Sequence, residues 1–145
     1  VLTYGLGLGY FAYMASEKPE VESVTVVEIS DEAIRLFNTH ILPQMPNGHK
    51  IKIVHTDALK YAKEVMPKEG FDMAFVDTWR DASDGTPMYK SIKPLEAENP
   101  DTKFYYWVEN FLRSGWRAEM YSELIKKYEN GLLEIDYDSF IEKIK

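Results

Sequence analysis

The segment most able to do chemistry is a glycine-rich stretch near the start of the chain, Gly5-Leu6-Gly7-Leu8-Gly9. It separates a short apolar run, Val1 to Tyr4, from a helical pattern, Tyr10 to Ser16. Glycines permit a tight turn and let the backbone lie against a ligand, with the N–H groups of the next helix nearby. A GxGxxG dinucleotide fingerprint would require glycine where Tyr10 stands. The loop therefore predicts either a ligand-binding turn or a turn that only packs a strand against a helix, and it disfavours a nicotinamide cofactor.

Three carboxylates stand at or just after the ends of predicted strands. Glu28 ends the second strand, where it could accept both hydroxyls of a ribose. Asp57 follows the third strand and could accept an adenine amino group, and Asp77 follows the fourth. In an open parallel sheet, ligands bind outside the carboxyl ends of the strands. Each residue also has a purely structural reading: a solvated strand end for Glu28, a helix N-cap for Asp57 and a turn residue for Asp77.

Alternating strands and helices must position these groups. The apolar patterns predict five strands, at Val1–Tyr4, Val24–Ile29, Ile51–Val54, Met73–Val76 and Phe104–Val108. They also predict five helices. The second begins after the N-cap Ser30 and ends at Pro43, and the other four are Tyr10–Ser16, Leu59–Val65, Arg117–Tyr128 and Ser139–Ile144. Asp81 to Pro87 is interpreted as the main irregular loop. Strands and helices at this spacing predict βαβ units and a parallel sheet.

The fifth strand is the most ambiguous element. Phe104 to Val108 is a continuous apolar run preceded by the turn signal Asn99-Pro100-Asp101, which favours a strand. However, Trp107, Phe111 and Trp116 belong to a set of apolar residues that also falls at helical spacing. We prefer the strand. The aromatic run predicts core packing, with a partner surface as the alternative.

Composition limits the classes of protein to consider. The chain has 145 residues, a net charge of −7 and no cysteine, which suits one domain without disulfides or thiolate metal sites. The acidic balance argues against nucleic-acid partners, and no apolar run is long enough to predict a membrane span. We expect a cytoplasmic protein. Because Val1 leads directly into a predicted core strand, we also expect the chain to be part of a longer protein.

Residues 1 to about 110 resemble the class I S-adenosylmethionine-dependent methyltransferase superfamily, on the GxGxG loop and the acidic strand ends. The glycine loop, Val27-Glu28-Ile29, Asp57-Ala58 and the segment Asp77 to Tyr89 are most similar to its spermidine-synthase-like branch. The resemblance implies a single Rossmann-like α/β domain over residues 1–145. It would be a three-layer sandwich with a mainly parallel sheet in the order 3-2-1-4-5, truncated at both ends relative to the family.

The resemblance also implies a site. S-adenosylmethionine, or its decarboxylated form, would be held by a set of residues at the carboxyl edge of the sheet: Gly5, Gly7, Gly9, Glu28, Ile29, Asp57, Ala58 and Asp77. Asp77 would be the catalytic residue that orients or deprotonates a small-molecule acceptor. One departure from the family is Thr3, which stands where methyltransferases usually carry an acidic residue.

Several alternatives remain open at this point. Methyl transfer to a small molecule is the first hypothesis, and aminopropyl transfer is the second, with Asp81 or Asp84 holding the charge of an amine. The third is a non-catalytic cofactor-binding or structural domain. Trp79 and Tyr89 could wall an acceptor pocket, although a core or hinge role is the preferred interpretation. We expect no metal, a structural role for His55, and a homo-oligomer as one option.

Overall fold

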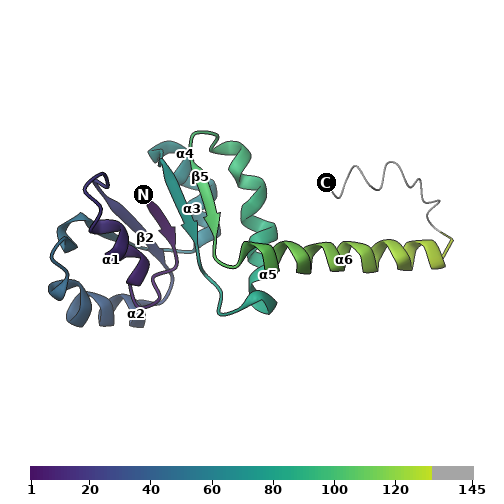
Figure 1. The fold of residues 1–145 in the computed structure, drawn as a ribbon, viewed down its shortest axis with the longest axis horizontal. Helices are drawn as coiled ribbons and strands as arrows, with labels where there is room; N and C mark the ends of the chain where they lie inside the picture. The colour runs from purple at the N-terminus through teal and green to yellow at the C-terminus, as the bar shows by residue number, and fades with distance from the viewer. Residues whose placement is uncertain (132–145) are drawn as a thin grey trace.

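Five parallel strands form one sheet in the order β3-β2-β1-β4-β5 (Figure 1). The strands are β1 (Leu2–Tyr4), β2 (Val24–Glu28), β3 (Ile51–His55), β4 (Met73–Val76) and β5 (Lys103–Tyr106). This computed structural model describes residues 1–131, so the predicted helix at Ser139–Ile144 lies outside the described residues. The chain has a Rossmann-like α/β fold, and the predicted fold class and strand order are confirmed.

Helices connect the strands. The α-helices are α1 (Tyr10–Ser16), α2 (Asp31–Leu36), α3 (Ala58–Glu64), α4 (Met66–Glu69), α5 (Ala82–Ile92) and α6 (Glu109–Glu129). A π-helical segment, η1 (Phe37–Ile41), and three 3₁₀ segments, η2 (Leu42–Gln44), η3 (Gly48–Lys50) and η4 (Lys93–Glu98), complete the connections. In residues 1–131, none of the helices combines the length and apolarity that crossing a bilayer requires.

The sheet separates two apolar cores. On one face, Ala12 of α1 and Phe37 of η1 pack with Val24 and Val26 of β2. On the other face a larger core joins α3, α4, α5 and α6 to the sheet, and its buried members include Leu2, Tyr4, Tyr61, Met66, Val76, Tyr89, Ile92, Tyr106 and Leu112. The strands that meet in the centre of the sheet are therefore buried on both faces, as their continuous apolar runs predict.

The predicted irregular loop at Asp81–Pro87 is wrong, because these residues form the first half of α5. Asp81 is the N-cap of the helix and accepts a hydrogen bond from the Ser83 N–H, while the carboxylate of Asp84 accepts one from the Asp81 N–H. This capping box starts a helix in a segment whose glycine and proline suggest a turn. Pro87 lies inside the helix.

The predicted helix at Arg117–Tyr128 is too short, since α6 begins at Glu109. The strand before it ends at Tyr106, two residues earlier than expected. Val108 turns the chain from β5 into α6 with a positive φ of 50°. The residues before Val108 therefore form the strand that the apolar run predicts, and those after it form the helix that the spacing of the aromatic residues predicts.

We predict that Gly85→Ala destabilises the fold, although alanine is the better helix former. A Cβ at Gly85 of α5 would lie 2.7 Å from Trp79 Cγ and 2.8 Å from Leu112 Cδ2, inside a packed core. Overpacking of this kind costs about 1–3 kcal/mol, more than the roughly 1 kcal/mol of helix propensity gained. Urea unfolding measures the difference in the free energy of unfolding.

The matched control is Gly115→Ala in α6. There the new Cβ would meet only the Thr86 hydroxyl, at 3.1 Å, so we expect a change within about 1 kcal/mol of zero. Equal effects of the two substitutions would contradict the packing argument.

Candidate functional site

The three glycines of the loop between β1 and α1 all have positive φ, at 96° for Gly5, 52° for Gly7 and 79° for Gly9. Two of them are also required by packing. A Cβ at Gly5 would lie 2.0 Å from the carbonyl oxygen of Asp77, and one at Gly9 would lie 2.2 Å from the ring of Phe37. Gly5 and Gly9 therefore let the loop pass against the end of β4 and against η1.

Gly7 is different, because no atom lies within 4 Å of the position its Cβ would take. The residue is exposed, and only its φ restricts the side chain. Asparagine adopts this left-handed conformation more readily than most residues that carry a Cβ. The open space beside Gly7 is thus the place where a ligand could approach the backbone of the loop.

The carboxylate of Glu28 joins the loop to the end of β2. Its Oε2 accepts a hydrogen bond of 2.9 Å from the N–H of Leu6, and its Oε1 accepts bonds of 2.8 Å from the N–H groups of Ile29 and Ser30. A carboxylate offers about four acceptor positions, so roughly one remains for a further donor. Glu28 is therefore more than a solvated strand end: it fixes the loop and keeps some capacity for a ligand.

Large apolar side chains are exposed on the loop and at the end of β2. Ile29 is 65% exposed, and Leu8 and Tyr10, on the loop and at the start of α1, are 77% and 73% exposed. The resemblance implies Ile29 as a site residue but does not select Leu8 or Tyr10. The signal that could have selected them is two large apolar residues within and next to a glycine turn.

His55 lies at the end of β3, next to Ile29. Its Nε2 is 3.0 Å from the carbonyl oxygen of Ile29, which assigns the proton to Nε2 when the ring is neutral. The hydrogen bond ties the ends of β2 and β3 together, in agreement with the structural role expected for His55.

Asp57 is the N-cap of α3, because its Oδ1 accepts a hydrogen bond of 2.9 Å from the Lys60 N–H. The structural alternative for this residue is thus present in the fold. Its Oδ2 accepts no hydrogen bond from residues 1–131. Ala58 is buried in the larger core. Asp57 can offer one oxygen to a ligand, whereas the Ala58 side chain cannot reach one.

Asp77 follows β4, and its backbone lies directly against Gly5. Its side chain is partly buried and accepts no hydrogen bond from the described part of the chain. Burial raises the pKa of this carboxyl above its ordinary value, because desolvation disfavours the charged form. A carboxyl with a raised pKa beside a glycine loop is a candidate for proton transfer.

Asp81 and Asp84 serve the backbone instead. Asp84 accepts hydrogen bonds from the N–H groups of Arg80 and Asp81, and Asp81 accepts two from Ser83. The bonds from Ser83 hold the pKa of Asp81 below its ordinary value. The bond from the Asp81 backbone N–H is the main reason that the pKa of Asp84 is also lowered. Both carboxylates therefore stay ionised while they cap α5.

Trp79 and Tyr89 are core residues, which agrees with the core or hinge role that was preferred over a wall of an acceptor pocket. Trp79 is 7% exposed and Tyr89 is 1% exposed. The Tyr89 hydroxyl donates a hydrogen bond of 2.9 Å to Glu109 at the start of α6. Neither ring walls an open pocket in the described structure.

No protein-family model and no curated protein matches this sequence. Among residues 1–131, His, Asp and Glu side chains nowhere gather in a group of three or more that could hold a metal ion.

We predict that Asp77→Asn stabilises the protein at neutral pH. A carboxyl whose pKa is raised in the folded state destabilises that state once it ionises, so stability falls as pH rises from about 3.8 through the folded pKa. Asparagine cannot ionise and avoids this loss. Urea unfolding at pH 3 and pH 7 should show the variant more stable than the parent at pH 7 only.

If the variant and the parent differ in free energy of unfolding by the same amount at pH 3 and pH 7, ionisation of Asp77 does not destabilise the folded state. Asp101→Asn, at an exposed aspartate just before β5, is the control, and we expect it to leave the pH dependence unchanged.

Proposed function

We propose that this chain binds S-adenosylmethionine at the glycine loop and transfers its methyl group to a small-molecule acceptor positioned by Asp77. The observation that carries the proposal is the direct attachment of two strand ends to one loop. Glu28 bonds the Leu6 N–H, and the backbone of Asp77 lies against Gly5. A hydroxyl-accepting carboxylate and a proton-accepting carboxyl are thereby held on the two sides of the same turn.

The donors and acceptors of the site suit a nucleoside. Glu28 has about one acceptor position left for a ribose hydroxyl, and a second hydroxyl would have to replace the bond from the Leu6 N–H. The exposed side chain of Ile29 offers an apolar surface for a base, and the free oxygen of Asp57 can accept from an exocyclic amine. The open space at Gly7 admits close approach to the backbone.

The role proposed for Asp77 follows from its protonation. The cofactor supplies a sulfonium whose methyl group is already reactive, so the protein must orient the acceptor and take its proton. The raised pKa of Asp77 brings the carboxyl closer to the range in which a general base works well. The methyl carbon would gain its bond to the acceptor as the methyl–sulfur bond breaks and leaves S-adenosylhomocysteine, and Asp77 would take the proton that the acceptor loses.

The alternative of aminopropyl transfer is less well supported. It assigns the charge of an amine to Asp81 or Asp84, and both carboxylates are already bonded to the backbone at the start of α5. An amine would have to compete with those bonds. As part of the proposal we keep the expected cytoplasmic setting, which suits a chain without cysteine.

The test of the proposed function is calorimetric titration of the chain with four compounds: S-adenosylmethionine, its decarboxylated form, S-adenosylhomocysteine and NAD. We expect S-adenosylmethionine and S-adenosylhomocysteine to bind and NAD not to bind. Preference for the decarboxylated form would favour aminopropyl transfer, and no binding at all would overturn the proposal.

We predict that Gly7→Asn abolishes cofactor binding without unfolding the chain. Asparagine accepts the left-handed conformation, so the cost in stability should stay within about 1 kcal/mol, but its side chain fills the open space beside the loop. Titration measures the affinity, and urea unfolding checks the fold. Undiminished affinity would show that the ligand does not approach Gly7.

We predict that Glu28→Ala lowers both affinity and stability. The substitution leaves the N–H groups of Leu6, Ile29 and Ser30 without their acceptor, and hydrogen bonds to a charged group contribute about 1.5–3 kcal/mol each. The same carboxylate is proposed to accept a ribose hydroxyl, and the loss of one such bond should lower the cofactor affinity at least tenfold. Glu32→Ala, at an exposed position in the first turn of α2, serves as the control and should leave the affinity unchanged.

A further inference from the structure

The pairing of β4 with β5 continues one residue beyond the ends of both strands. The Trp107 N–H donates a hydrogen bond of 3.0 Å to the carbonyl oxygen of Val76. This bond extends the register of the two strands, in which Val76 pairs with Tyr106, so that Asp77 pairs with Trp107. Because neighbouring strands lie about 4.8 Å apart, Trp107 is the next residue to Asp77 along the carboxyl edge of the sheet.

Trp107 lies on the same face of the sheet as Asp77. Successive residues of a strand alternate between the two faces, and Tyr106 belongs to the larger core. Trp107 is therefore on the face that carries α1, as is Phe75, two residues before Asp77. Helix α1 covers Phe75, because the rings of Phe11 and Phe75 stack with their centres 4.3 Å apart. Trp107 lies one strand farther out and remains 40% exposed.

Within residues 1–131, the side chain of Trp107 belongs to neither apolar core. Its ring packs against no other aromatic ring of these residues, and its Nε1 donates no hydrogen bond to them. The two other tryptophans, Trp79 and Trp116, both pack in the larger core. A large aromatic ring without a packing role, at the edge of a parallel sheet where ligands bind, indicates a surface for a ligand.

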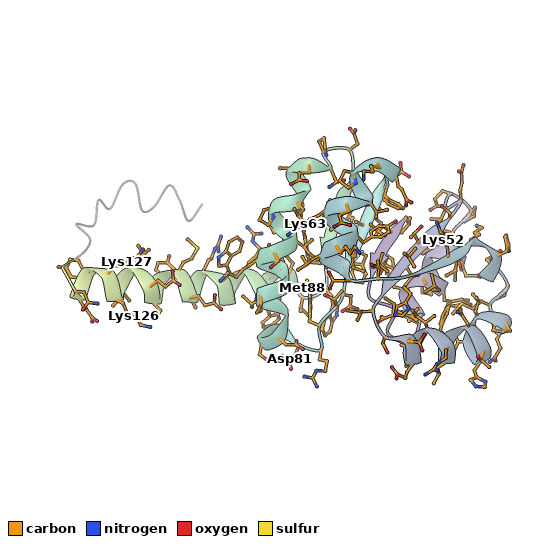
Figure 2. The ribbon with its side chains drawn as sticks, turned by 180° about the vertical axis from the view of Figure 1, so that it is seen from behind. Lys52, Lys63, Asp81, Met88, Lys126 and Lys127 are labelled. Carbon is orange, nitrogen blue, oxygen red and sulfur yellow. The ribbon has the colours of Figure 1, made fainter. Side chains whose placement is uncertain are left out.

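Helix α6 does not cover the ring of Trp107. Its first half is held on the face of the larger core, where Glu119 forms an ion pair of 2.7 Å with Lys90 of α5. Its second half extends away from the body of the molecule, with Lys126 and Lys127 near the far end (Figure 2). Both halves therefore leave open the side of the sheet on which Trp107 and the site lie.

We propose that Trp107 binds the acceptor of the transfer reaction, and that this acceptor is a planar aromatic compound with a hydroxyl or amino group on its ring. An exposed indole offers a flat apolar surface on which a second ring can stack. Asp77, one strand away, then faces the group attached to the stacked ring. The inference rests on the proposed function, because it assigns the substrate class of the same site.

Trp107 and Asp77 divide the work of the reaction between them. The oxygen or nitrogen of the acceptor supplies the electron pair for its new bond to the methyl carbon, and the pair of the broken methyl–sulfur bond returns to sulfur. The proton that the acceptor loses passes to Asp77. Trp107 exchanges no proton, and its contribution is to hold the ring so that the reacting atom faces the methyl group.

Because the chain has three tryptophans, fluorine NMR of the full chain labelled with fluorotryptophan can follow each of them. The resonance of Trp107 is assigned by its loss in Trp107→Phe. The labelled chain, saturated with S-adenosylhomocysteine, is titrated with 2-naphthol and with decahydro-2-naphthol, which has the same carbon skeleton but no aromatic ring. We expect 2-naphthol to shift the Trp107 resonance and not those of Trp79 and Trp116. Decahydro-2-naphthol should shift none of the three.

Substitutions separate stacking on Trp107 from folding and from cofactor binding. Trp107→Ala should weaken 2-naphthol binding in equilibrium dialysis at least about fivefold, while urea unfolding and the affinity for S-adenosylhomocysteine stay unchanged. Trp107→Phe keeps a ring and should retain most of the 2-naphthol affinity. Tyr105→Ala is the matched control, because Tyr105 lies on the same face with the same exposed fraction of 40% but pairs with Phe75 instead of Asp77. It should leave the 2-naphthol affinity unchanged.

Three outcomes would overturn the role of Trp107 and leave the proposed function in place. The first is a Trp107 resonance that 2-naphthol does not shift although S-adenosylhomocysteine binds. The second is an equal shift with decahydro-2-naphthol, and the third is an equal loss of 2-naphthol affinity in Tyr105→Ala. If S-adenosylhomocysteine does not bind the unaltered chain, the proposed function is wrong, and the assignment of the acceptor falls with it.

Discussion

The bond from the Leu6 N–H to the carboxylate of Glu28 is the contact on which the candidate site depends. A loop rich in glycine has many conformations to lose on folding, and an anchor must offset that entropy. Glu28 supplies this anchor from the end of β2, while Thr25, Val26 and Val27 hold β2 against β1. This side chain therefore adds to the backbone bond from the Gly5 N–H to the Val27 carbonyl oxygen in holding the loop to β2, and the group that shapes the loop is also the group proposed to bind the ribose.

Aspartate has two different roles at the carboxyl edge of the sheet. Asp57 caps α3, Asp81 and Asp84 cap α5, and Asp77 is left partly buried without a hydrogen bond from residues 1–131. Their chemistry differs because their surroundings differ: bonds from backbone N–H groups hold the pKa of Asp81 and Asp84 down, and burial raises that of Asp77. Asp81 and Asp84 use their carboxylates to start α5, and Asp57 caps α3 through one oxygen and keeps the other free of bonds from residues 1–131. The side chain of Asp77 makes no comparable bond within these residues.

Much of the fold could be predicted, because it follows from local patterns. The run of β-branched residues predicts β2 and the short apolar run at 73–76 predicts β4, both almost to the residue, and the N-cap Ser30 predicts the start of α2. The start of α5 could not be found in this way, since Gly85 and Pro87 suggest a turn and the reasons for them are distant in sequence. Gly85 is required by contact with Trp79 and Leu112. The start of α6 could not be predicted because the aromatic residues at the end of β5 continue directly into those of the helix. Only the left-handed turn at Val108 separates the two elements. At the site, sequence could select Glu28 and Asp77 but could not show that the loop touches both strand ends.

The three glycines of the loop also differ in what would happen to them in evolution. Gly5 and Gly9 are held by the packing of Asp77 and Phe37, so any descendant that keeps the fold must keep both. Gly7 meets no neighbour within 4 Å, and its conformation is open to asparagine. A lineage that lost its ligand would retain the outer pair and drift at the middle position. Variation at this one residue, compared with constancy at the other two, would then record whether natural selection still acts on binding.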